Sequence, residues 1–349
     1  MRSLYPGRRT AWLLLFALLL LAGRPVQAAP AHQATQPAVT QDSATQPVDV
    51  VVLLDDSGSM ATCWPWPQDR PPFAPPCGGP SPNLPSDPGE LRYSAARLLL
   101  ELADADDRVA VVRFDSDAEG VGALGALTPV GSAENRRQLS ATLQAPDDYF
   151  QRGYTRIDLG LEEAIRLLDE GRTPGRSQYV LLLTDGEPSA QSGVTNQTER
   201  VREQIAALNA SGALVFPVVL CNPSAGCAGD FLREEFADFG VREAKSAPEL
   251  LQIFSDIVAD MKPDRSVTDR RNGAGALQVS IRDAHGAQNM AFVTPSNALL
   301  NVQRDSQPAL ARTLLDDSNI SVSLIDQAQL ASGQWTVDTS DVSGFAVIQ

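Results

Sequence analysis

Histidine is scarce in this chain of 349 residues, and its scarcity narrows the reactions that the protein could catalyse. The only two histidines are His32, in a linker-like stretch, and His285, in the C-terminal part of the chain. A nucleophilic serine needs a base within hydrogen-bond reach, and neither histidine is placed to supply one. The sequence also lacks a His-Glu-x-x-His helix and a glycine-rich phosphate loop. We therefore expect a protein that is not an enzyme.

Positive charge is also in short supply. The chain has 28 lysines and arginines against 43 acidic residues, which gives a formal net charge of −15. Residues 1–28 hold four arginines and no acid, so their removal would change this charge to −19. An excess of negative charge disfavours nucleic acid as a partner, because its phosphates would be repelled. The same excess is compatible with a protein that holds divalent cations.

Long hydrophobic runs are missing after the N-terminus. The longest run, residues 11–22, follows several arginines and is too short to span a bilayer of about 30 Å as a helix. Small residues at 26–28 offer a cleavage site. We expect residues 1–28 to be a secretory signal peptide, with an uncleaved membrane anchor as the alternative. The expected location is secreted or at the cell surface, with no membrane-spanning segment in the mature chain.

Only four cysteines are present, and they form two local pairs. Cys63 is near Cys77, and Cys221 is near Cys227. Thiols of an exported protein meet an oxidising environment, so we expect two disulfides that close short loops. A zinc site with four thiolates is the alternative, and it is weaker because neither pair has the two-residue spacing typical of such sites.

The middle of the chain alternates between strand-like and helix-like segments. Residues 29–47 are mostly Ala, Gln, Thr and Pro and are expected to be a disordered linker. Within residues 48–262, strands are predicted at 48–54, 107–114, 178–184 and 213–220 and near Val241, and helices at 91–102, 132–143, 157–168, 197–210, 230–239 and 248–261. This alternation predicts the α/β class, with a doubly wound, mostly parallel sheet and helices on both faces. Ligands of such sheets bind beyond the carboxyl ends of the strands.

Two stretches depart from this alternation. Residues 61–90 contain ten prolines, which are incompatible with regular structure; we expect a loop, clipped by Cys63 and Cys77, that partly covers the neighbouring strand end. After residue 263, apolar and polar residues alternate, which predicts a small antiparallel, β-sandwich-like domain at 266–349. Its last residues read as a strand cut short, as in a fragment of a longer chain.

Oxygen-bearing side chains follow the first predicted strand. Asp55, Ser57 and Ser59 are spaced by two, so an extended turn would bring one carboxylate and two hydroxyls to the same side. Such ligands suit a hard cation, namely Mg²⁺, Mn²⁺ or Ca²⁺. The alternative is an ordinary turn in which these side chains bond their own backbone. Thr155, before a predicted helix, and Asp185, at the end of another buried strand, fall at the same edge of the predicted sheet.

This three-part pattern resembles the von Willebrand factor type A domain, whose metal-ion-dependent adhesion site reads Asp-x-Ser-x-Ser, then Thr, then Asp. The resemblance covers residues 48–262. It implies that the cation, Mg²⁺ or else Mn²⁺ or Ca²⁺, is held by Asp55, Ser57, Ser59, Thr155 and Asp185. It also implies that an Asp or Glu of a protein partner replaces a water on the ion. The expected function is an exported, metal-dependent adhesion or protein-interaction module; a structural or matrix spacer and a metal-assisted hydrolase are the alternatives.

Three residues near the motif depart from the family pattern or are not explained by it. Tyr154 stands where a glycine is common, and Arg156 follows the threonine, so we expect them to narrow or charge the approach to the ion. Asp56, between the predicted ligands, is expected to point into solvent rather than to support a ligand.

Overall fold

The structure, a computed structural model, describes most of the chain from residue 46 onward. The described residues are 46–60, 86–87, 90–144, 153–186, 188–189, 194–221, 226–227, 229–262, 266–268, 275–281, 289–295, 300–316, 320–326, 333–339 and 345–348. They all belong to one of the two units into which the chain divides, Gln41–Gln349. The predicted signal peptide, almost all of the predicted linker, most of the proline-rich stretch, and Cys63 and Cys77 lie outside them.

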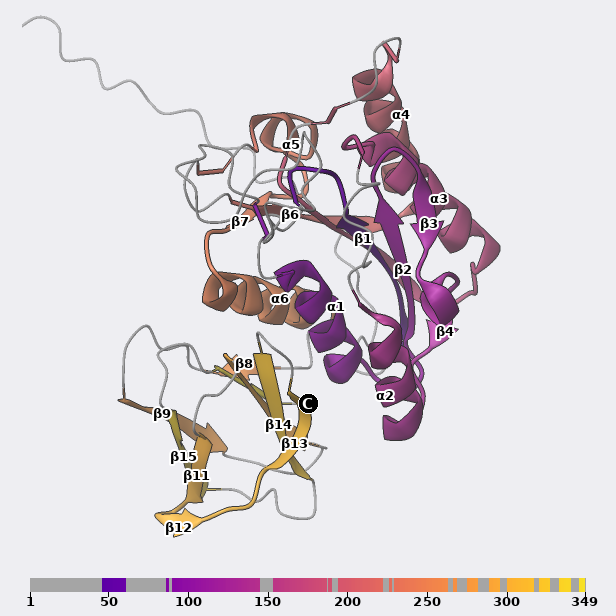
Figure 1. The fold of residues 1–349 in the computed structure, drawn as a ribbon. Coiled ribbons are helices and arrows are strands. Elements are labelled where there is room, and N and C mark those ends of the chain that lie inside the picture. The colour runs from indigo at the N-terminus through magenta and orange to yellow at the C-terminus, as the bar shows by residue number, and fades with distance from the viewer. Residues whose placement is uncertain are drawn as a thin grey trace, which may run out of the picture. The chain divides into compact units, whose positions relative to one another are not determined.

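A seven-stranded sheet forms the centre of the first half of this unit (Figure 1). Its strands are β1 (Val48–Asp55), β2 (Arg108–Phe114), β3 (Ala118–Gly120), β4 (Thr128–Pro129), β5 (Ser177–Thr184), β6 (Leu214–Leu220) and β7 (Arg242–Ala244). The order is β3-β2-β1-β5-β6-β7, and β4 also pairs with β2. The five predicted strands are parallel, whereas β3 and β4 pair antiparallel with β2. Neither short strand was predicted, since two or three residues show no periodicity.

Helices cover both faces of this sheet, which confirms the predicted fold class. They are α1 (Leu91–Leu102), α2 (Ala133–Thr142), α3 (Ile157–Glu170), α4 (Gln197–Ser211), α5 (Asp230–Glu235) and α6 (Ala247–Met261), with a 3₁₀ turn, η2, at Gly122–Leu124. Successive side chains of a strand point to opposite faces. In β1, Val50 and Val52 pack in a cluster with α1, α2 and α6, whereas Val51 and Leu53 pack in a cluster with α3, α4 and α5. Burial on both faces explains the nearly unbroken apolar run of β1.

The strand order reverses beside the end of β1. From β1 the chain passes through α1 to β2 on one side, and it later returns to β5 on the other side of β1. The helices that follow these two neighbouring strands, α1 after β1 and α4 after β5, lie on opposite faces. Ligands of parallel sheets bind beyond the carboxyl ends of the strands at such a reversal. Asp55, which ends β1, and Asp185, which follows β5, lie at this point of the sheet.

Antiparallel strands follow α6, as predicted. They are β8 (Ser266–Thr268), β9 (Gly275–Ile281), β10 (Asn289–Pro295), β11 (Leu300–Arg304), β12 (Gln307–Pro308), β13 (Arg312–Asp316), β14 (Ile320–Asp326), β15 (Gly333–Thr339) and β16 (Phe345–Ile348). One sheet has the order β13-β14-β10-β16-β8 and the other β12-β11-β15-β9. In β15, Trp335 and Val337 are buried and Thr336 between them is half-buried, as period two requires. The domain boundaries 48–262 and 266–349 stay a prediction.

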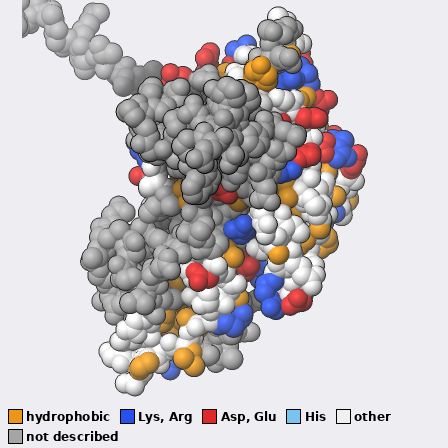
Figure 2. Space-filling view, viewed as in Figure 1, with side chains coloured by type: hydrophobic (Ala, Val, Ile, Leu, Met, Phe, Trp, Pro, Cys, Tyr) orange, Lys and Arg blue, Asp and Glu red, His pale blue; other side chains and the backbone are white. Residues whose placement is uncertain are grey.

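Exposed charges of both signs are interspersed over α3 and α4, on the right of the space-filling view (Figure 2). Arg166 pairs with Glu163 and Glu170, and Arg200 pairs with Glu162 of the neighbouring helix. Exposed pairs of this kind contribute about 0–1 kcal/mol each. These charged side chains keep the outer surface of α3 and α4 solvated and add little to stability. No helix in the described ranges is both long and apolar enough to cross a membrane.

Candidate functional site

Asp55 ends β1 with its side chain completely buried. Its Oδ1 accepts a hydrogen bond from the Ser57 backbone N–H at 2.8 Å, and its Oδ2 accepts one from the Thr184 hydroxyl at 2.5 Å. Burial, with the nearby charge of Asp185, raises the pKa of Asp55 to about 7, although the hydrogen bonds from Ser57 and Thr184 oppose the rise. Among the described lysines and arginines none forms an ion pair with Asp55, so this carboxylate has hydrogen-bond donors but no compensating cation.

The turn after β1 places two hydroxyls beside each other. The Oγ atoms of Ser57 and Ser59 are 3.1 Å apart; Ser57 is buried and Ser59 is exposed. The Gly58 N–H donates to the carbonyl oxygen of Gly153 at 3.1 Å, which joins this turn to the loop that leads to Thr155. A side chain at Gly153 is excluded by close approach, because its Cβ would lie 1.8 Å from the Ser116 Oγ.

Thr155 precedes α3 and is almost fully buried. Its N–H donates to the Ser189 Oγ at 2.9 Å, and its carbonyl oxygen accepts from the Ser189 N–H at 3.1 Å and from the Gln197 side chain at 2.7 Å. Ser189 follows β5 and Gln197 begins α4. The segment after β5 thus holds the backbone of Thr155 on both its N–H and its carbonyl side.

Asp185 follows β5 directly and is half-buried. Its Oδ2 accepts a hydrogen bond from the Ser86 hydroxyl at 2.8 Å, and the Ser86 N–H donates to the Ser59 carbonyl oxygen at 2.9 Å. Hydrogen bonds thus join the three segments that carry the five predicted residues, Asp55, Ser57, Ser59, Thr155 and Asp185, at the ends of β1 and β5.

Four residues that hold this cluster were not predicted, namely Ser86, Thr184, Ser189 and Gln197. Thr184 stands next to Asp185 in the sequence, and its place at the end of a buried strand was a usable signal. Ser86, Ser189 and Gln197 lie in or beside loops, where no periodicity shows which segment they will meet. Their role depends on contacts between distant segments, which a single sequence does not reveal.

The prediction that Asp56 points into solvent is wrong. Its side chain is buried, with Oδ1 accepting from the Arg92 Nη2 at 2.6 Å and Nε at 3.2 Å, and Oδ2 accepting from the Tyr93 hydroxyl at 2.8 Å. Arg92 is fully buried and also donates to Asp87 Oδ2 at 2.7 Å. Side chains alternate along β1, so Asp56 turns away from Asp55 and meets the start of α1. Asp56 therefore fixes α1 to the end of β1.

Tyr154 and Arg156, which were expected to affect the approach to the ion, have different surroundings. Tyr154 is 41% exposed, and its N–H donates to the Ser116 hydroxyl. Its ring is one of the few large apolar side chains that the described residues leave in solvent. The Nε and Nη2 of Arg156 donate hydrogen bonds to the two carboxylate oxygens of Asp158, both at 2.8 Å. Its charge is thereby paired, so Tyr154 can narrow the approach while Arg156 contributes little net charge there.

The chemistry of these residues fits a divalent cation. They offer three hydroxyl oxygens and two carboxylates, with no nitrogen or sulfur ligand, which is a donor set for a hard cation. Buried carboxylates are normally paired with a cation, because an uncompensated buried charge is costly. Asp55 has no such partner among the described residues, so a bound cation would compensate its charge; without one, burial favours its neutral form. The identity of the ion is not fixed by this donor set.

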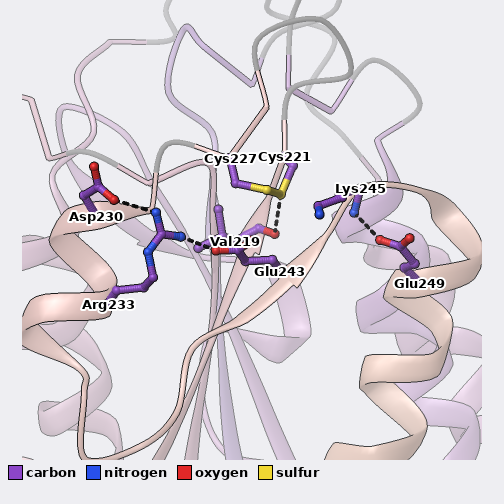
Figure 3. Close-up of a disulfide and its surroundings, with 8 residues drawn as sticks. All are labelled: Val219, Cys221, Cys227, Asp230, Arg233, Glu243, Lys245 and Glu249. Atoms are coloured by element: carbon purple, nitrogen blue, oxygen red, sulfur yellow. Dashed lines mark hydrogen bonds and ion pairs between the residues drawn. A yellow bond between two sulfur atoms is a disulfide. The ribbon is translucent and has the colours of Figure 1, made fainter. Parts of the chain in front are cut away.

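The cysteine pair at the end of β6 does not form a second metal centre. Cys221 and Cys227 form a disulfide (Figure 3), which confirms one of the two predicted disulfides. The distance between their Cα atoms is 4.2 Å. Within the described ranges, Cys221, Cys227 and Glu243 are the only cluster of three or more histidine, cysteine or acidic side chains spaced for a metal. Since both sulfurs are consumed by the disulfide, no thiolate remains there to bind zinc.

Comparisons with known proteins agree with this architecture. Residues 89–224 match the sequence profile of the von Willebrand factor type A domain, a match that includes Thr155 and Asp185 and begins after Ser59. No curated protein matches the chain as a sequence relative.

Three solved structures are similar to the chain. They are proximal thread matrix protein 1 from the mussel byssus (16% identity, 64% of this chain and 49% of that chain, TM-score 0.42), a von Willebrand factor type A protein from Catenulispora acidiphila (14%, 87% and 58%, 0.43), and the PilB minor pilin from Streptococcus sanguinis (15%, 63% and 62%, 0.44). The chain spans less than two thirds of each of these structures. Within the chain, residues 89–224 are therefore similar to a von Willebrand factor type A domain.

Proposed function

We propose that the protein is an exported, metal-dependent adhesion or protein-interaction module. The observation that carries this proposal is that hydrogen bonds join the segments that hold Asp55, Ser57, Ser59, Thr155 and Asp185 at the ends of β1 and β5. These residues would hold Mg²⁺, Mn²⁺ or Ca²⁺. The ion, when bound, supplies positive charge that an Asp or Glu of a partner protein can neutralise.

The residues of the site differ in their exposure to solvent. The buried carboxylate of Asp55 sits at the back, held by Thr184, whereas Ser59 is exposed. A partner would therefore approach from the side of Ser59. Tyr154, exposed beside Thr155, offers that partner an aromatic surface at the rim. Neutral hydroxyls on the solvent side would leave the charge of the ion available to the partner.

Export is part of this proposal. The Cys221–Cys227 disulfide supports it, because disulfides persist in oxidising compartments and are rare in the cytosol. The signal peptide lies outside the described residues and stays a prediction. The absence of catalysis is likewise proposed; it rests on the sequence, in which neither histidine falls in the motifs that carry Ser57 and Ser59.

A thermal-shift measurement tests the cation site. Chelated wild-type protein should gain stability on addition of Mg²⁺, Mn²⁺ or Ca²⁺, since a ligand at 100 times its Kd stabilises a fold by about 2.7 kcal/mol. Ser59→Ala should lose most of this response. Ser211→Ala, which removes a hydroxyl from the far end of α4, is the matched control and should respond like wild type. An equal response of Ser59→Ala and wild type would refute the site.

A capture experiment from native extracellular material, with and without chelator, tests the function. Capture that chelator abolishes supports the proposal. Capture that is unaffected by chelator would indicate a binding surface elsewhere on the protein. Absence of any captured protein would favour a structural or matrix spacer. Peptide-bond cleavage of the captured partner would favour a metal-assisted hydrolase instead.

A further inference from the structure

Ser86 touches two of the five predicted cation-binding residues, although it belongs to none of the motifs. Its hydroxyl donates to Asp185 Oδ2 at 2.8 Å, and its backbone N–H donates to the carbonyl oxygen of Ser59 at 2.9 Å. The two contacts join the turn after β1 to the residue after β5. Ser86 is thus a direct link between the first and the last part of the site.

Ser86 is itself held in a fixed frame by the residue that follows it. Asp87 is buried, and its Oδ1 accepts from the Leu91 N–H at 2.7 Å at the start of α1. Its Oδ2 accepts from Arg92 Nη1 at 2.7 Å, and the same guanidinium binds Asp56. Because Asp87 is held in this way, the backbone at Ser86 is fixed in position. The Ser86 hydroxyl can therefore hold its acceptor, Asp185, in one orientation.

The acceptor, Asp185, is engaged on one side only within the described part of the chain. The hydrogen bond from Ser86 reaches Oδ2, and among the described residues no hydrogen bond or ion pair reaches Oδ1. Hydrogen bonds to one oxygen of a metal-binding carboxylate fix its rotamer and so orient the other oxygen.

We propose that Ser86 is a positioning residue of the cation site, whose hydroxyl orients Asp185 so that Oδ1 faces the ion. This inference rests on the proposed cation site. Loss of the hydroxyl should weaken cation binding by about 10- to 100-fold, the usual effect of removing a hydrogen-bond partner of a metal ligand. If Ser86 instead competed with the ion for Asp185, loss of the hydroxyl would tighten binding, so the sign of the change separates the two roles.

The experiment is a calorimetric titration of the chelated full chain with Mn²⁺ alone. Ser86→Ala should raise the Kd about 10- to 100-fold, and Ser86→Thr, which keeps the hydroxyl, should stay within a few-fold of wild type. Thr128→Val removes a hydroxyl from the short strand β4 and should leave the Kd unchanged. Thermal unfolding of the chelated variants shows whether each is folded.

Several outcomes would overturn the proposal. An unchanged or lower Kd for Ser86→Ala would do so, as would failure of Ser86→Thr to restore binding. Wild type that binds no Mn²⁺ would overturn both this inference and the cation site, whereas binding that is lost in Ser59→Ala but kept in Ser86→Ala would overturn this inference alone.

A double-variant cycle covers the case in which Ser86→Ala is poorly folded. The hydroxyl acts through Asp185, so Ser86→Gly should weaken binding in the wild-type background and have little further effect in an Asp185→Asn background. Equal and additive effects in the two backgrounds would overturn the proposed role.

Discussion

Arg92 and Asp56 form a buried ion pair in which the Nη2 of Arg92 lies 2.6 Å from the Oδ1 of Asp56. The guanidinium also pairs with Asp87 at 2.7 Å, so one cation pairs with two carboxylates. Because Asp56 follows β1 and Asp87 precedes α1, the three side chains fix the distance between the sheet and the helix.

Replacement of this arginine should be strongly destabilising. Arg92→Met would leave two buried carboxylates without a cation, and the free energy of unfolding should fall by about 3–5 kcal/mol. Urea unfolding of the chelated protein measures the change. Arg137→Ala, which breaks an exposed pair with Glu134, is the control and should cost less than about 1 kcal/mol. Similar losses in the two variants would contradict a special role for the buried pair.

Thr184 should stabilise the cation-free protein through its bond to Asp55. Thr184→Val keeps the shape of the side chain but removes the donor that reaches Oδ2 at 2.5 Å. A buried acceptor that loses its donor costs about 1–3 kcal/mol, so the chelated variant should unfold at lower urea concentration. Thr184→Ser retains the hydroxyl and should lose less. Equal stability of the valine variant and wild type would show that this bond contributes nothing.

The stability of the fold should depend on the ionisation of Glu101 in α1. Burial raises the pKa of this side chain from 4.5 to about 7, although the charges of Arg136, Arg312 and Arg137 oppose the rise. The folded protein therefore favours the protonated form. The stabilising contribution is fully present below pH 4.5 and is lost as the pH rises through about 7.

Glu101→Gln tests this dependence, because glutamine stays neutral. Its free energy of unfolding, relative to wild type, should increase between pH 5 and pH 8 by about 1–3 kcal/mol. Urea unfolding at the two pH values gives the difference. Glu134→Gln, at an exposed position of α2, should show no such change. A constant difference between Glu101→Gln and wild type across this range would contradict the assigned pKa.

The disulfide after β6 should add to stability. Cys221 and Cys227 are separated by six residues, and closing so short a loop is worth about 2 kcal/mol in the unfolded-chain entropy model. A variant with serine at both positions should unfold at lower urea concentration by that amount. Mass spectrometry of the alkylated wild-type protein should find no free thiol at either position; a reactive Cys221 would contradict the pairing.

Periodicity made the main elements of the fold predictable. The strand at β1 and the helices α1 and α3 were identified because each carries a long apolar pattern that only one type of element satisfies. The helix predicted at 230–239 is shorter in the structure, because α5 ends at Glu235 and residues 236–239 form a turn around the buried Phe236. The spacing of the apolar residues in that turn resembles helical periodicity, which is why the sequence predicted a longer helix.

The candidate site was predictable in its composition and less so in its support. Asp55 and Asp185 could be placed because each ends a buried parallel strand, and such ends share one edge of the sheet. Asp56 could not be placed, since its partner Arg92 lies beyond a stretch whose path the sequence does not indicate. Long-range hydrogen bonds between polar side chains leave no periodic trace, which is why Ser86 also escaped prediction.

The contact between Ser59 and Ser86 has a consequence for how this protein can change over generations. Their backbones lie 2.9 Å apart although 26 residues separate them in the sequence, so a hydrogen bond joins the two ends of the intervening segment. Doubling the length of a flexible connection costs only about 0.6 kcal/mol. The segment between them can therefore be lengthened, shortened or exchanged while the sheet and α1 stay in place, which makes this position a natural point for evolutionary variation and for grafting new sequences.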